Sequence, residues 1–196
     1  MTSPRAVIFD LDGTLTAPLL DFDAMRAEIG LPPGPILEQL AQADAATRAR
    51  ADEILRRHER EAMGRAKLAD GCAELLGRLA DLGIPVAILT RNVREVVDTF
   101  VSTFGFSFAG VYTREDGPHK PSPAGVLLLC TKMGIAPAET LVVGDYKFDI
   151  LAGRAAGCTT ALVLGADRPS PDELPEWGPP DLVVESLREL LPRFAP

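Results

Sequence analysis

Apolar residues follow two different spacings along the chain. Short, mostly apolar runs stand at residues 6–9, 84–89, 109–113, 140–143 and 159–164. Such runs are typical of buried strands in a parallel sheet. Between the later runs, apolar residues recur every three or four positions, as they do in amphipathic helices. Because strands that alternate with helices pair in parallel through right-handed crossovers, the pattern predicts an α/β fold with a doubly wound, Rossmann-like parallel sheet. We expect five strands, or six if residues 181–184 add an edge strand.

The segment after the first strand departs from this alternation. No strand is expected from Pro18 to Ala69, and residues 36–65 predict one or two helices. Apolar residues in the second of these fall on one helical face, and the opposite face is polar. We therefore expect residues 16–70 to form a small, all-helical domain inserted after the first strand. Residues 1–15 and 71–196 would then form the Rossmann-like core.

Composition and charge exclude several classes of protein. The net charge is −8 and no basic run occurs, so nucleic acid and anionic membrane surfaces are not expected partners. No apolar run approaches the ~20 residues that span a bilayer, and the first strand begins too early for a signal peptide. The 3 cysteines are scattered, which predicts reduced, buried thiols in a cytoplasmic protein. Residues 165–180 contain five prolines and are expected to be loop, with Trp177 packing against it.

Polar residues follow the ends of four predicted strands. In chain order they are Asp10, Asp12, Thr90, Lys120, Asp145 and Asp149. The carboxyl ends of parallel strands meet at one edge of the sheet, where ligands bind in open α/β folds. Helix capping and solubility do not account for such a convergence, so we expect a chemical site there.

The chemistry that fits these residues is phosphoryl transfer through a covalent aspartyl phosphate. Crowded carboxylates repel one another and require a cation, and a small set of anionic oxygen ligands favours Mg²⁺. Asp10 is the expected nucleophile, with Mg²⁺ and Lys120 offsetting its repulsion from the phosphoryl group. Asp12, two residues on, would protonate the leaving oxygen and later take a proton from the attacking water.

The residues Asp10-Leu-Asp-Gly-Thr14, followed in order by Thr90, Lys120 and Asp145, resemble the motifs of the haloacid dehalogenase superfamily. The resemblance is to its phosphatases, in the branch around phosphoglycolate phosphatase and β-phosphoglucomutase. It covers nearly the whole core, and it implies a cap domain where residues 16–70 stand. This cap is smaller than is usual in the branch, and the cap supplies most contacts to the leaving group.

The resemblance also implies roles for individual residues. Mg²⁺ would be held by Asp10, by the backbone carbonyl of Asp12 and by Asp145. Asp149 would bind the ion directly or through water. Thr90 would hydrogen-bond the phosphoryl oxygens, and Lys120 would neutralise them.

Two further residues stand beside Thr90 in the sequence. Asn92 with Glu95 resembles a helix-capping pair, although its backbone is also a candidate phosphate contact. The pattern does not fix the direction of Arg91, so its contact with the substrate stays an open alternative.

We therefore expect a Mg²⁺-dependent phosphatase that acts on a small phosphorylated metabolite. One alternative is a mutase of the β-phosphoglucomutase type, which must keep water from the aspartyl phosphate and for which residues 16–70 make a small cap. Another is a non-catalytic module that binds a phosphorylated ligand or a protein, although such a module does not need Asp10 and Asp12. The sequence leaves monomer and homodimer open.

Overall fold

The computed structural model describes residues 3–164 and 178–194. The chain divides into two compact units. Met1–Pro18 and Lys67–Pro196 form the first, which we call the sheet unit, and Leu19–Ala66 form the second, the helical unit. Most of the proline-rich loop, including Trp177, lies outside the described residues.

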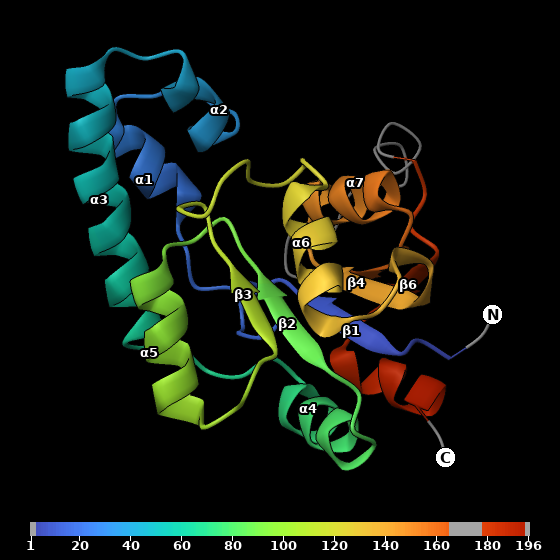
Figure 1. The fold of residues 1–196 in the computed structure, drawn as a ribbon. Helices are drawn as coiled ribbons and strands as arrows, with labels where there is room; N and C mark the ends of the chain where they lie inside the picture. Colours follow the sequence, from blue (N-terminus) through green and yellow to red (C-terminus); the bar gives the residue numbers. More distant parts are fainter. Residues whose placement is uncertain (1–2, 165–177, 195–196) are drawn as a thin grey trace. The chain divides into compact units, whose positions relative to one another are not determined.

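The sheet unit is built on one six-stranded, fully parallel sheet in the order β3-β2-β1-β4-β5-β6 (Figure 1). The strands are β1 (Ala6–Phe9), β2 (Val86–Leu89), β3 (Gly110–Tyr112), β4 (Thr140–Gly144), β5 (Thr159–Val163) and β6 (Leu182–Val184). The predicted doubly wound α/β sheet is confirmed, and the edge strand is present as its sixth member. Sheet order reverses direction between β1 and β4, which is the switch point where ligands bind in such folds.

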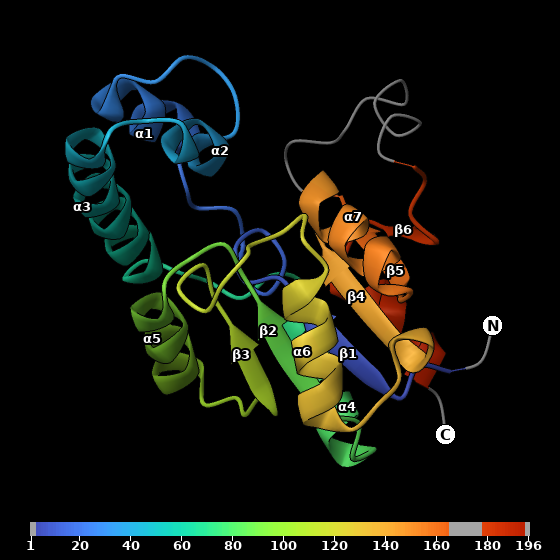
Figure 2. The same ribbon diagram turned by 45° about the horizontal axis from the view of Figure 1, so that its top comes forward.

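Helices cover both faces of this sheet. They are α4 (Cys72–Asp81), α5 (Arg94–Phe104), α6 (Ala124–Met133) and α7 (Lys147–Ala156), with 3₁₀ segments η1 (Pro137–Glu139) and η2 (Leu187–Phe194). Helices α6 and α7 lie on one face (Figure 2), over a core that includes Ile8, Val142 and Leu129. The expected last helix is a 3₁₀ segment with Pro192 inside it, since proline removes a helical donor.

The central strand β1 is buried at every residue. A parallel strand has apolar neighbours on both faces, which explains its uninterrupted Ala-Val-Ile-Phe sequence. Phe9, its last residue, is in register with Ile88 of β2 and Val143 of β4. The three strands therefore end close to the same level, and the residues that follow them meet.

The helical unit contains α1 (Phe22–Ile29), α2 (Ile36–Ala41) and α3 (Ala45–Met63), with no strand among its residues. Asp21 caps α1 by accepting from the backbone N–H of Ala24, and Asp44 caps α3 in the same way through Thr47. Its small core consists of Met25, Ile29, Ile36, Leu40, Ala51 and Leu55. Glu28 of α1 pairs with Arg57 and His58 of α3, so polar contacts join the same two helices.

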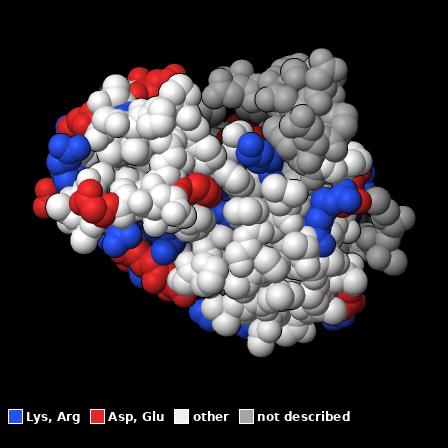
Figure 3. Space-filling view, turned by 90° about the horizontal axis from the view of Figure 1, so that it is seen from above, with Lys and Arg blue, Asp and Glu red and all other residues white. Residues whose placement is uncertain are grey.

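All three cysteines are free and buried, as predicted, and burial raises the pKa of the Cys72 and Cys158 thiols to about 12. Among the described residues, no helix combines the length and apolarity that a membrane crossing requires. On the face drawn in Figure 3, Lys and Arg are scattered among Asp and Glu and form no single large basic area.

Candidate active site

The end of β1 places Asp10 at the edge of the sheet. Its backbone N–H donates to the carbonyl of Val143 at 2.9 Å, which continues the pairing with β4 by one residue. The chain then turns back, and the carbonyl of Leu11 accepts from Thr14, Leu15 and Thr16. The backbone N–H of Leu11 donates to Oδ1 of Asp10 at 2.7 Å. This turn fixes the first carboxylate of the motif.

Two glycines make room for the carboxylates that follow β4. Gly13 has φ +79°, and a Cβ there would lie 2.1 Å from Oδ2 of Asp145. A Cβ on Gly144 would lie 2.1 Å from Cγ of Asp149. A side chain at either position would therefore displace a carboxylate, and at Gly13 it would also strain the left-handed backbone.

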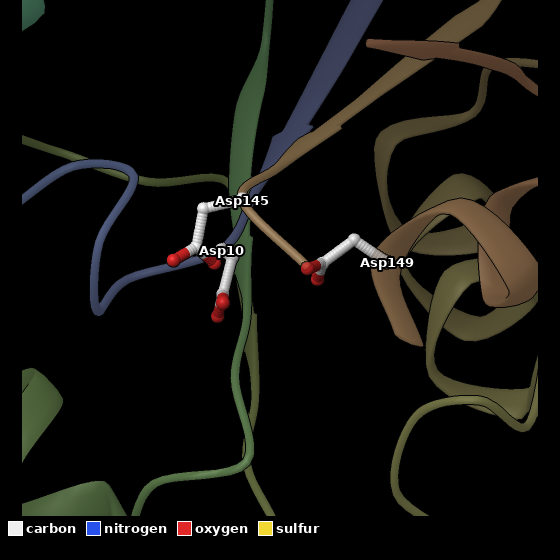
Figure 4. Close-up of side chains that lie close together, drawn as sticks. All are labelled: Asp10, Asp145 and Asp149. Carbon is white, nitrogen blue, oxygen red and sulfur yellow. The ribbon is translucent and has the colours of Figure 1, made fainter. Parts of the chain in front are cut away.

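Asp10, Asp145 and Asp149 form a compact cluster of carboxylates (Figure 4). One oxygen from each lies within 4.8 Å of the others. Burial, with the charges of Asp10 and Asp149, raises the pKa of Asp145 well above its ordinary value. Burial raises the pKa of Asp149 to about 6, with Asp10 adding to the rise and Lys120 opposing it. Three carboxylates so close together are unfavourable as anions unless a cation lies among them.

Lys120 is the cation that the chain itself supplies, and only 2% of it is exposed. Its Nζ lies 2.8 Å from Oδ1 of Asp10 and 2.5 Å from Oδ1 of Asp149. Burial alone would lower the pKa of this ammonium, but the charges of Asp10 and Asp149 outweigh it and raise the pKa. One ammonium leaves the cluster with excess negative charge. An oxygen-only donor set with uncompensated charge fits a hard divalent cation such as Mg²⁺.

The loop after β2 reaches the same site. The backbone N–H of Asn92 donates to Oγ1 of Thr90 at 3.0 Å, and its Nδ2 donates to Oδ2 of Asp12 at 3.1 Å. The expected capping pair of Asn92 and Glu95 is wrong, because α5 begins after Val93 and has no side-chain cap. Sequence reasoning missed the contact with Asp12, since the two residues lie 80 positions apart and only the sheet brings them together.

Arg91 joins loops on the two sides of β1. Its guanidinium carbon lies 4.2 Å from the ring centre of Phe148, at the start of α7, and its carbonyl accepts from Arg114 at 3.2 Å. The Phe148 ring also contacts the ring of Tyr146 at 5.2 Å. Because β2 and β4 flank β1 in the sheet, this contact links the loops beside Asp10. Of the predicted site residues, Arg91 contacts Phe148 and so connects the two loops. Thr90, Asn92 and Lys120 make hydrogen bonds or ion pairs with other residues of the site.

The chain is similar to one family model and to several known proteins. Residues 16–163 match the family model described as haloacid dehalogenase-like hydrolase. The chain is 36% identical to a haloacid dehalogenase-like hydrolase domain-containing protein of Arabidopsis thaliana, over 96% of this chain and 83% of that protein. It is 33% identical to a phosphoglycolate phosphatase of Xanthomonas campestris pv. campestris, over 97% of this chain and 96% of the relative.

A solved structure shares the fold. A hydrolase from Pseudomonas syringae superposes with a TM-score of 0.81 at 22% identity, covering 95% of this chain and 96% of that one. The residues that match the family model, 16–163, run from Thr16 in the turn after β1 to the end of β5. They include most of the sheet unit and all of the helical unit. This chain belongs to the family of haloacid dehalogenase-like hydrolases.

Proposed function

We propose that this chain is a Mg²⁺-dependent phosphatase that hydrolyses a small phosphomonoester through an aspartyl phosphate on Asp10. One observation carries the proposal: Asp10, at the end of the central strand, is held 2.8 Å from a buried lysine within a cluster of three carboxylates. A carboxylate that meets an anionic phosphoryl group needs such cations beside it. The Xanthomonas relative named phosphoglycolate phosphatase supports the substrate class.

The residues present fit the proposed metal ion. Asp10, Asp145 and Asp149 would hold it with the backbone carbonyl of Asp12, and Asp149 would bind directly or through water. When bound, Mg²⁺ supplies positive charge that offsets the repulsion between the nucleophile and the phosphoryl group. Lys120 supplies a second positive charge, and Thr90 is the proposed hydrogen-bond donor to phosphoryl oxygens. Arg91 and the backbone of Asn92 are proposed further substrate contacts.

Catalysis would take place in two displacements. A carboxylate oxygen of Asp10 forms a bond to phosphorus as the bond from phosphorus to the leaving oxygen breaks, and Asp12 gives its proton to that oxygen. Water then attacks phosphorus while Asp12 takes a proton from it. The bond to Asp10 breaks, inorganic phosphate leaves, and both carboxyl groups return to their starting state.

The proposal is tested by phosphate release from a panel of phosphomonoesters that includes 2-phosphoglycolate and several sugar phosphates. Wild type and Asp10→Asn are compared with Mg²⁺ and with a chelator. We expect one or a few metabolites to be hydrolysed by the wild type only with Mg²⁺. Asp10→Asn should keep the circular dichroism spectrum and lose at least about a thousandfold in kcat.

Each contrary result has a distinct meaning. An active Asp10→Asn protein would exclude the covalent mechanism, and full activity in chelator would exclude the metal. Isomerised sugar phosphate in place of free phosphate would identify a mutase. A wild type that releases phosphate from no member of the panel would overturn the phosphatase proposal.

The free, buried thiols at Cys72, Cys130 and Cys158 support a reducing compartment. We propose a cytoplasmic location on that ground. Fractionation of the native cells, with a cytoplasmic marker enzyme, would test it.

A further inference from the structure

Asn92 is fixed at each of its polar atoms. It is 3% exposed. Its backbone N–H donates to Thr90 Oγ1 at 3.0 Å, and its backbone carbonyl accepts from Arg114 at 3.2 Å. Its side-chain Oδ1 accepts from the backbone N–H of Val93 at 2.8 Å, and Nδ2 donates to Oδ2 of Asp12 at 3.1 Å. A buried side chain held in this way has one available orientation.

The orientation of the amide follows from its partners. The N–H of Val93 can only donate, so the atom that faces it must be the amide oxygen. The amide nitrogen is then directed at Asp12. A flipped amide would place its NH₂ group against an N–H donor and its oxygen against a carboxylate, and both pairs would be unfavourable.

Asp12 lies outside the named helices and strands, so contacts from other loops help to orient its side chain. It stands in the turn after β1, beside Gly13 with its left-handed φ of +79°. A group that transfers a proton must lie within hydrogen-bond reach of the reacting atom. A misplacement of about 1 Å is enough to cost about a hundredfold in rate.

We infer that Asn92 is a positioning residue that orients the carboxyl group of Asp12 for proton transfer to the leaving oxygen. The inference rests on the proposed function. The amide N–H donates to Oδ2 of Asp12 at 3.1 Å and so limits the rotation of the carboxyl group about its Cβ–Cγ bond. In the first displacement the bond from phosphorus to the leaving oxygen breaks as a proton moves from Asp12 to the oxygen. The side chain of Asn92 exchanges no proton itself and makes no contact with the phosphoryl group.

The test compares two leaving groups, because only a poor one requires the proton. The glycerol of β-glycerol phosphate would leave as an unstable alkoxide unless its oxygen is protonated. The leaving group of p-nitrophenyl phosphate is a stable phenolate that does not need the proton. The parameter compared is kcat/KM, which reports on the steps up to formation of the aspartyl phosphate. It therefore omits the later hydrolysis of that intermediate, which is the same for both substrates. The variants are Asn92→Ala, Asp12→Asn and the double variant. Thr99→Ala is the matched control, since its exposed hydroxyl donates within α5 to the carbonyl of Glu95 and, in the described part of the chain, to no group outside that helix.

We expect Asn92→Ala to lower kcat/KM for β-glycerol phosphate by about 10- to 100-fold. The loss for p-nitrophenyl phosphate should be less than about threefold. Asp12→Asn should show the same preference with a larger loss, and adding Asn92→Ala to it should change little, since both act through one group. Thr99→Ala should match the wild type on both substrates.

A second substitution separates positioning from folding. Asn92→Asp keeps an oxygen for the Val93 N–H but replaces the donor that faces Asp12, so it should also lose more on β-glycerol phosphate. Equal losses on the two substrates, or full additivity with Asp12→Asn, would overturn the inference while leaving the proposed function intact. An inactive wild type or an active Asp10→Asn protein would overturn both.

Discussion

The ammonium nitrogen of Lys120 lies 2.8 Å from Oδ1 of Asp10 and so links the loop after β3 to the end of β1. The same nitrogen contacts Asp149 in the first turn of α7. A single buried cation therefore fixes two carboxylates that come from different strand ends. It offsets part of their charge, and the remainder is what we propose that Mg²⁺ neutralises.

Lys120→Met should damage both the reaction and the metal-free fold. Without the ammonium, the buried carboxylates lose their partner, and breaking such a pair costs about 3–5 kcal/mol of unfolding free energy. The loss of positive charge at the phosphoryl group should lower kcat by about a hundredfold or more. Urea unfolding in chelator and phosphate release with Mg²⁺ measure the two effects. Lys132→Met, at an exposed position of α6, should change neither, and a Lys120→Met protein within a few-fold of wild-type kcat would show that another group supplies the charge.

Mg²⁺ binding should release protons in mildly acidic solution. Burial raises the pKa of Asp149 to about 6 from an ordinary value of 3.8, and the pKa of Asp145 is also raised. The metal-free cluster therefore binds protons near pH 5.5 that ligation must displace. We expect calorimetric titrations in two buffers of different ionisation enthalpy to show proton release at pH 5.5 that disappears by pH 8. Mg²⁺ affinity should rise over the same interval, and Asp149→Asn should release fewer protons.

The same raised pKa values predict that the metal-free protein becomes less stable as pH rises, whereas its Mg²⁺ affinity increases. A carboxyl whose pKa is higher in the folded state stabilises the fold below its unfolded value, here near 3.8, and that contribution is lost as pH rises through about 6. We therefore measure the free energy of unfolding of the wild type and of Asp149→Asn in chelator as a function of pH. Between pH 3.8 and about 6, the wild type should lose stability relative to the variant. Identical pH dependence of the two proteins would contradict the raised pKa.

The sequence was informative where local pattern and sheet topology agree. β1 and the polar residues after it could be located because a buried parallel strand is apolar throughout and its carboxyl end faces the site. The convergence of Lys120 with Asp10 follows from the same rule, although the distance between them does not. Contacts between residues that follow parallel strand ends can therefore be predicted from the sequence alone.

Other features depend on neighbours that the local pattern does not contain. Asn92 stands three residues before Glu95, as in a capping box, yet its amide binds Asp12 in another loop. Gly13 has a left-handed φ of +79°, which a glycine adopts readily in the turn after β1. Its closeness to Asp145 is set by the pairing of β1 with β4, which no local window shows.

Gly13→Ala should weaken Mg²⁺ binding by displacing Asp145, and Gly105→Ala provides a control for backbone strain. The two glycines have similar left-handed φ values, +79° and +75°, but a Cβ meets Asp145 only at Gly13 and finds open space at Gly105. Each alanine should therefore cost about 1 kcal/mol of unfolding free energy. Gly13→Ala alone should also lose Mg²⁺ affinity and about a hundredfold in kcat/KM, because the carboxylate must move. Calorimetry with Mg²⁺ and phosphate-release kinetics on both variants measure this difference. If the two variants bound Mg²⁺ equally well, the position of Asp145 would not matter for the metal, and its proposed role as a ligand would be wrong.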